Sequence, residues 1–223
     1  AGVEAGPVAS GPPGPVVPVD AARAPGPSFP RPLEDCVAGY EWFITPADAL
    51  GVDATGIAVA GTSAGGNLAA ALCIAARERG LPQPVLQLLD APALDLTLAS
   101  SSMAEFGDGP LGRAEVDAFV CDYVADETAR RDPLVSPLHC ADLTGLAPAV
   151  ITVAEMDSVR DDGERYLARL HAAGVAGTCV RVQAMFHVGW VVPLTTTHRL
   201  VNDLRAAALR RAFDGTLNPL DKR

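Results

Sequence analysis

Lysine is almost absent from this chain of 223 residues, where Lys222 is the only example. The chain has 17 lysine and arginine residues against 27 aspartate and glutamate residues, so its formal net charge is −10 at pH 7. A nucleic acid or an anionic membrane surface attracts a basic protein and repels an acidic one. We therefore expect neither kind of partner.

Long apolar runs are also missing. No continuous stretch reaches the roughly 20 apolar residues that a helix needs to cross a bilayer. The first residues do not show a basic segment followed by an apolar one, which is the pattern of a secretory signal peptide. These absences predict no membrane span and a cytoplasmic location.

The cysteines are few and show no metal-binding or redox spacing. There are 5 of them, an odd number, and no Cys-x-x-Cys pair occurs. The simplest interpretation is reduced thiols in a cytosolic protein. A catalytic cysteine and a metal site are the alternatives. The five positions are Cys36, Cys73, Cys121, Cys140 and Cys179.

What the chain does have is a globular composition. Hydrophobic residues make up 49% and the mean hydropathy is +0.21. The length fits one large α/β domain. Residues 1–15 are rich in Gly, Pro and Ala and predict a flexible tail, and residues 16–223 predict a single partial domain. Residues 95–140 resemble a lid-like insertion, whose first part, at 95–113, is rich in loops.

Apolar strand patterns alternate with amphipathic helix patterns along the chain. This alternation predicts right-handed crossovers and a mostly parallel sheet with helices on both faces. Strands are expected at 57–60, 85–89, 149–153 and 179–182, with a weaker one at 16–19 that contains Pro18. Helices are expected at 32–50, 64–79, 113–124, 159–173 and 197–213.

The segment Gly-Thr-Ser-Ala-Gly at 61–65 lies between a predicted strand and a predicted helix. Gly-x-Ser-x-Gly in that context is the nucleophile elbow of serine hydrolases. The turn is so sharp that the residues two before and two after the serine must be small, and Gly61 and Gly65 meet this demand. The first turn of the helix offers free N–H groups, so the backbone N–H of Ala64 is the expected oxyanion donor for a nucleophilic Ser63.

A serine nucleophile needs a base, and the chain has 4 histidines. In an open parallel sheet the reacting groups lie on loops beyond the carboxyl ends of strands. Only His187 directly follows a strand, because it comes at the end of the run 180–186 that continues the predicted strand at 179–182. The other histidines, His139, His171 and His198, lie in the insertion or in helices. His187 is therefore the predicted general base, and a structural histidine that caps this strand is the alternative.

The base in turn needs an orienting acid. Asp157 lies just beyond the strand at 149–153 and is the preferred candidate, although it could simply cap the following helix. Asp161 is the alternative within that helix. Asp90 and Asp95, which follow the strand at 85–89, form a second alternative. The preferred order along the chain is then serine, aspartate, histidine, as in α/β hydrolases.

Residues 16–213 resemble the hormone-sensitive-lipase-like family of α/β hydrolases, in its bacterial carboxylesterase branch. The resemblance is carried by Ile-Ala-Val-Ala-Gly-Thr-Ser-Ala-Gly-Gly-Asn-Leu-Ala at 57–69, Asp132-Pro133, Ser136-Pro137-Leu138, the acid motif at Asp157, Arg160-Asp161 and Gly163, and His187. Ser158-Val159 stands where the family usually has Pro-Leu.

The chain also departs from this family. Relatives carry a His-Gly-Gly-Gly loop upstream of the serine that supplies oxyanion donors, but no histidine precedes Ser63 here. The N-terminal cap helices and the first sheet strands have no counterpart either. The resemblance thus implies an N-terminally incomplete α/β hydrolase that lacks the N-terminal strands and the cap. We expect five main strands and slow catalysis. Either the strand at 16–19 lies beside the strand at 57–60, or an apolar strand edge is left open and favours self-association.

Together these features predict a serine carboxylic ester hydrolase that cleaves short-chain acyl esters through an acyl-enzyme. Its partner would be a small-molecule ester, with no metal and no organic cofactor. Two alternatives stay open: a truncated or degenerate hydrolase with little turnover, and a small-molecule binding module on the same fold.

Overall fold

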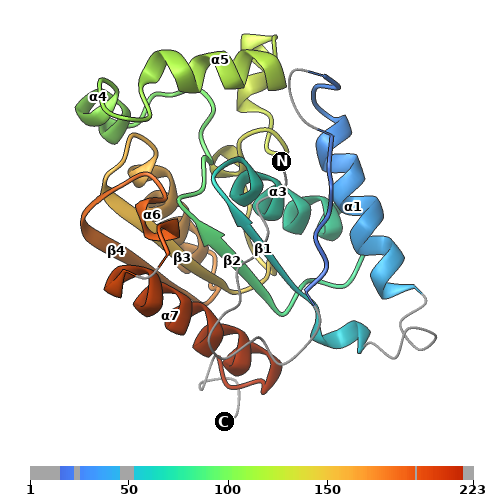
Figure 1. The fold of residues 1–223 in the computed structure, drawn as a ribbon. Coiled ribbons are helices and arrows are strands. Elements are labelled where there is room, and N and C mark those ends of the chain that lie inside the picture. The colour runs from blue at the N-terminus through green and yellow to red at the C-terminus, as the bar shows by residue number, and fades with distance from the viewer. Residues whose placement is uncertain (1–15, 23–25, 46–52, 194, 218–223) are drawn as a thin grey trace. The chain divides into compact units, whose positions relative to one another are not determined.

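A computed structural model describes residues 16–22, 26–45, 53–193 and 195–217 of the chain (Figure 1). The predicted tail at 1–15 lies outside these ranges. The chain divides into two compact units, which are described separately. The larger unit spans Val19–Gly189, and the smaller consists of Ala1–Pro18 together with Trp190–Arg223.

The larger unit is built on a parallel sheet whose four strands run in chain order. In Figure 1 these strands form the centre of the unit. Each crossover brings the chain back to the same end of the sheet, so all carboxyl ends share one edge. The strands are β1 (Ala58–Thr62), β2 (Leu86–Asp90), β3 (Ala149–Met156) and β4 (Gly177–Phe186).

Three helices form the framework around this sheet. They are α1 (Arg31–Ile44), α3 (Ala64–Glu78) and α6 (Arg160–Ala172). The small alanine side chains of α3 let it approach the strands closely, and α3 shares one buried apolar cluster with β2, β3 and α6. Apolar residues of α1 pack on the other side of α3, beginning with Leu33 and Val37. This packing fixes the start of α3 relative to the ends of the strands.

The predicted strand at 16–19 is wrong, since residues 16–20 are described without regular structure. Pro18 has no N–H group to donate to a ladder, and Val16 and Val17 are exposed. Within the described ranges the sheet therefore has four strands, not five, and β1 pairs only with β2.

The insertion between β2 and β3 carries more structure than its composition indicates. It contains α4 (Ser101–Phe106) and α5 (Arg113–Tyr123), drawn in green beyond one end of the sheet in Figure 1. Short 3₁₀ turns follow at Glu127–Arg131 and Pro137–His139. These elements bury a separate apolar cluster that includes Leu96, Met103, Val116, Val120 and Val135.

The smaller unit contains α7 (Thr196–Phe213), close to the predicted 197–213. Its first turn is capped by the Thr195 side chain, which accepts a hydrogen bond from the His198 backbone N–H at 3.0 Å. His198 Nδ1 lies 2.9 Å from the Trp190 carbonyl oxygen.

Candidate active site

The turn from β1 into α3 holds Ser63 in a backbone conformation that side-chain-bearing residues rarely adopt. Its φ is 55° and its ψ is −117°, and it is the N-cap of α3. The Ser63 N–H donates to the carbonyl oxygen of Asp90 at the end of β2, at 2.8 Å. Strained residues of this kind persist only where the surroundings fix them, and they concentrate at functional sites.

Two glycines, Gly61 and Gly66, make this turn sterically feasible, and only Gly61 belongs to the Gly-x-Ser-x-Gly motif. A Cβ atom on Gly61 would lie 2.0 Å from the carbonyl oxygen of Gly65. On Gly66, a Cβ atom would lie 2.8 Å from Cβ of Pro92. The expected demand for a small residue at Gly65 is wrong, because a Cβ atom there meets nothing within 4 Å. At Gly65 the backbone carbonyl group lies close to Gly61, whereas a side chain would face open space.

His187 lies directly beyond β4, with its ring between two partners. Its Nε2 atom is 3.0 Å from Ser63 Oγ, and its Nδ1 atom is 2.8 Å from Oδ2 of Asp157. The expected hydrogen-bond distance between serine and histidine is therefore present. Because both ring nitrogens are engaged, the ring orientation is defined from both sides.

An irregularity in β4 precedes this histidine. Ala154 pairs with Val182 and Met156 pairs with Phe186, so two steps along β3 correspond to four along β4. Within this bulge Ala184 has a φ of 52°, and its N–H donates to Oε2 of Glu155 at 2.7 Å. Bulges of this kind bend a strand and redirect the residues that follow it.

Asp157 is buried at the turn from β3 into α6. While Oδ2 faces His187, Oδ1 accepts the Val159 N–H at 3.0 Å, so the carboxylate is fixed at both oxygens. The alternative acid, Asp161, points elsewhere: its Oδ2 accepts the backbone N–H of Ser102 in α4 at 2.8 Å. The structure brings Asp157 to His187 and places Asp161 against the insertion.

The remaining candidates lie apart from this group. Asp95 Oδ1 is 2.9 Å from His139 Nε2 and 2.6 Å from Thr97 Oγ1. His171 Nε2 is 3.1 Å from the carbonyl oxygen of Gly177. Asp90 contributes its backbone carbonyl to the Ser63 turn.

The expected oxyanion donor, Ala64, is the first residue of α3. An N–H group in the first turn of a helix has no partner one turn earlier, so it is available to an external acceptor. The positive end of the helix dipole adds to this property. The free N–H group and the helix dipole both favour negative charge at the start of α3, beside Ser63.

The thiols lie outside this arrangement, and all five cysteines are free. Burial raises the pKa of Cys36 to about 11 and that of Cys73 to about 12. These two thiols thus stay protonated at neutral pH and are poor nucleophiles. In the described part of the chain no group of three metal-ligating side chains gathers, and no helix there is long and apolar enough to cross a membrane.

Two buried polar residues near the site escaped sequence reasoning. The Asn67 Nδ2 group donates to the carbonyl oxygens of Ala93 and Val135 at 2.7 and 2.8 Å. Asp162 Oδ2 accepts backbone N–H groups from Leu94 and Asp95. Their only signal in the sequence is a polar residue on an otherwise apolar helix face, and this does not identify a partner.

Comparison with known proteins shows which proteins this chain is similar to. Residues 6–191 match a family model described as the alpha/beta hydrolase fold. The chain is 42% identical over 168 residues to the carboxylic ester hydrolase LipN of Mycobacterium tuberculosis, covering 72% of this chain and 45% of LipN. It is 34% identical over 175 residues to the ethyl acetate hydrolase of Pseudomonas putida, covering 78% and 55%.

A solved esterase gives the same result in three dimensions. The hyperthermophilic esterase from Pyrobaculum calidifontis superimposes with a TM-score of 0.80 at 35% identity, covering 85% of this chain and 64% of that one. The chain thus spans about half the length of the curated relatives it matches. On the fold and these matches, the chain belongs to the α/β-hydrolase-fold family, in its hormone-sensitive-lipase-like carboxylesterase branch.

Proposed function

We propose that this chain is a serine carboxylic ester hydrolase with Ser63 as nucleophile, His187 as general base and Asp157 as orienting acid. The observation that supports this most is the position of His187, with Nε2 at 3.0 Å from Ser63 Oγ and Nδ1 at 2.8 Å from Asp157. A strained serine, a histidine and a buried carboxylate in this order are the parts that acyl transfer requires.

In the first step Ser63 Oγ attacks the ester carbonyl carbon while Nε2 of His187 takes the hydroxyl proton. The negative charge that develops on the carbonyl oxygen is stabilised by the N–H of Ala64. The tetrahedral intermediate then breaks its bond to the alcohol oxygen. His187 returns the proton to the departing alcohol, which leaves an acyl group on Ser63.

The second step repeats the first with water as the nucleophile. His187 accepts a proton from the water while the water oxygen bonds to the acyl carbon. The bond between the acyl carbon and Ser63 Oγ then breaks, and His187 returns the proton to Oγ. Asp157 keeps Nδ1 protonated and stabilises the imidazolium that forms twice per cycle. The products are a carboxylic acid and an alcohol, and no metal or organic cofactor takes part.

The proposed substrates are esters with short acyl chains. The ethyl acetate hydrolase relative, whose name specifies a two-carbon acyl group, supports this choice. A cytoplasmic location and self-association through the outer edge of β1 are further proposals. An unpaired strand edge offers free N–H and C=O groups to a second chain, which supports the latter.

A fluorophosphonate probe and p-nitrophenyl acetate test the proposal together. Wild-type protein should become labelled on Ser63 and release p-nitrophenol, and both Ser63→Ala and His187→Ala should fall to near background. Labelling without turnover would indicate a reactive serine in a degenerate hydrolase. Hydrolysis that survives in purified Ser63→Ala would refute the assignment of the nucleophile.

A further inference from the structure

The loop that follows β2, residues Ala91–Leu98, is the part of the molecule on which this inference depends. It has no helix or strand, yet most of its residues are buried. Ala91 has a φ of 39° and Leu98 a φ of 56°, both in the region that favours glycine. Each such residue costs about 1–3 kcal/mol, so other contacts must hold the loop in this form.

The middle of this loop touches the elbow directly. The Ala93 N–H donates to the carbonyl oxygen of Ser63 at 3.4 Å, and the Ala93 carbonyl accepts from Asn67 in α3. Next to it, Pro92 lies against Gly66 so closely that no Cβ atom fits between them. A displacement of Pro92 or Ala93 would therefore be transmitted to the Ser63 turn.

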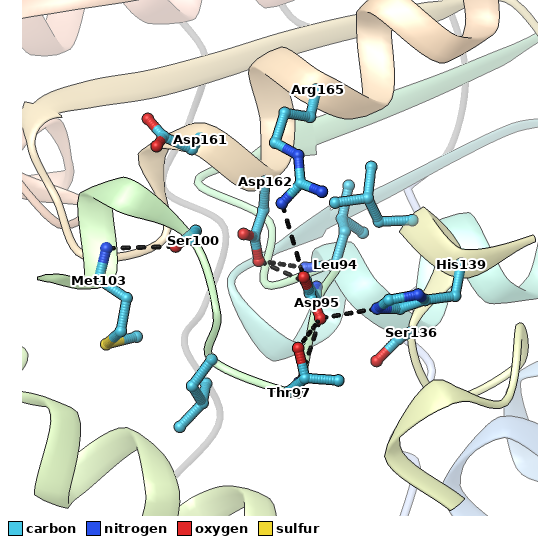
Figure 2. A network of polar contacts seen from close by, with 12 residues as sticks. Leu94, Asp95, Thr97, Ser100, Met103, Ser136, His139, Asp161, Asp162 and Arg165 are labelled. Carbon is cyan, nitrogen blue, oxygen red and sulfur yellow. Dashed lines mark hydrogen bonds and ion pairs between the residues drawn. The ribbon is translucent and has the colours of Figure 1, made fainter.

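The next two residues of the loop are held by a single carboxyl oxygen. Oδ2 of Asp162 accepts the N–H groups of Leu94 at 2.9 Å and of Asp95 at 3.0 Å, and the side chain is buried (Figure 2). Figure 2 shows Asp162 directed toward the loop, whereas the adjacent Asp161 is directed away from it.

Asp95 then continues the network on the far side of the loop. Its carboxylate is hydrogen-bonded to Thr97 and His139 and lies 3.6 Å from the Arg165 guanidinium. These partners satisfy Asp95 without involving His187. Asp162 therefore fixes the backbone of the loop. In the described ranges no other side chain accepts the Leu94 N–H.

We propose that Asp162 is a positioning residue for the nucleophile: by holding the N–H groups of Leu94 and Asp95, it keeps Pro92 and Ala93 against the elbow and so keeps Ser63 in its reactive conformation. The inference rests on the proposed function of Ser63. Asp162 touches neither Ser63 nor His187 in this scheme, and acts only through the loop backbone.

The test compares Asp162→Ala with Asp162→Asn and with Asp161→Ala. Asp161→Ala is the matched control, because it also removes a carboxylate from the first turn of α6. That carboxylate accepts the backbone N–H of Ser102 in α4. The readouts are the second-order rate of Ser63 labelling by a fluorophosphonate, kcat and KM for p-nitrophenyl acetate, and circular dichroism to establish folding.

Asp162→Ala should lower the labelling rate and kcat by about 10- to 100-fold with little change in KM, since a small displacement of a reacting atom has effects of this size. Asp162→Asn should stay within about threefold of wild type, because the amide oxygen still accepts both N–H groups. Asp161→Ala should label at the wild-type rate. Folded Asp162→Ala that labels as fast as wild type would overturn the positioning role alone, whereas wild-type protein that is never labelled would overturn the proposed function as well.

If Asp162→Ala does not fold, the pH dependence of labelling in wild type and Asp162→Asn decides. The charged groups that face Asp162 are Asp95 in the loop and Arg165 one turn along α6, with His139 behind Asp95. Burial raises the pKa of Asp162 to about 8, and the Asp95 carboxylate adds to this rise. Above that pH the wild-type rate should decline as the two carboxylates repel each other, and Asp162→Asn should show no such decline. A nuclear magnetic resonance titration of Asp162 gives its pKa independently. A labelling profile that shows no change through that measured pKa would overturn the inference.

Discussion

Two neighbouring turns at the same edge of the sheet are held in place by different means. The turn after β1 is made possible by a local steric feature, because a Cβ atom on Gly61 would overlap the carbonyl group of Gly65 four residues later. Backbone hydrogen bonds with Asp90 and Ala93 then hold the turn in place. The loop after β2 is fixed by hydrogen bonds from distant parts of the chain, namely Asn67, Ser136 and Asp162. A short motif thus permits the first turn, whereas nothing in the sequence of the second turn indicates its form.

The largest expected effect separates the residues that take part in the reaction from those that support the turns. Asp157→Asn should reduce kcat by roughly 10³- to 10⁴-fold, because an amide opposite Nδ1 of His187 favours the wrong tautomer and cannot stabilise the imidazolium. Asp161→Asn should stay within a few-fold of wild type. Steady-state kinetics on p-nitrophenyl acetate measure both, and a loss at Asp161 equal to that at Asp157 would reverse the assignment.

The next prediction concerns the glycines in the turn after β1. Gly61→Ala should cost more than about 3 kcal/mol of the free energy of unfolding or prevent folding, since its Cβ atom would overlap the Gly65 carbonyl. Gly65→Ala should fold with a free energy of unfolding within about 1 kcal/mol of wild type, because its Cβ atom faces open space. Urea denaturation of both variants measures the difference. Equal destabilisation would show that the motif acts through something other than these contacts.

A smaller effect is expected when the hydrogen bonds of Asn67, which join α3 to the loop after β2, are removed. Asn67→Ala leaves the carbonyl oxygens of Ala93 and Val135 without their donor and should cost about 2–3 kcal/mol together with a loss of kcat. Gln87→Ala is the matched control: it removes a buried amide that donates to the Ala147 carbonyl, away from the elbow. The control should lose stability but keep its kcat per folded molecule. A comparable loss of kcat in both variants would contradict the specific link between Asn67 and the elbow.

The smallest effect concerns the charge on Asp162. With a folded pKa of about 8, this carboxyl group holds a proton that the unfolded chain releases near pH 4, so its contribution to stability falls as the pH rises from about 4 to about 8. Asp162→Asn removes this dependence. Its free energy of unfolding should exceed that of wild type by more than about 1 kcal/mol at pH 8, and the difference should shrink toward pH 4. A constant difference across this range would place the folded pKa near its usual value.

The sequence alone predicts those parts of the site that depend on the order of neighbouring residues. The helices at 64–79, 113–124, 159–173 and 197–213 differ from α3, α5, α6 and α7 by one residue at the ends, since apolar periodicity and glycine stops define them. The positions of Ser63, Asp157 and His187 at strand ends followed from the same patterns, while their catalytic roles stay a prediction.

What could not be predicted depends on contacts between distant residues. The loop after β2 takes its form from Asn67, Ser136 and Asp162, which nothing in its own sequence reveals. The short helix α4 was missed because its anchors, Asp161 and Ser158, lie more than fifty residues away. The weak strand at 16–19 was predicted from β-branched residues alone, and it has no partner strand within the described ranges.

The bulge in β4 has a consequence for how the chain tolerates insertions and deletions. Two extra residues lie between the paired positions Val182 and Phe186, and two is an even number. Because side chains alternate between the faces of a strand, an even insertion shifts the histidine loop along the sheet without turning it over. Loss of a single residue here would direct the side chain of His187 to the opposite face. Length variation before this histidine is therefore expected in steps of two.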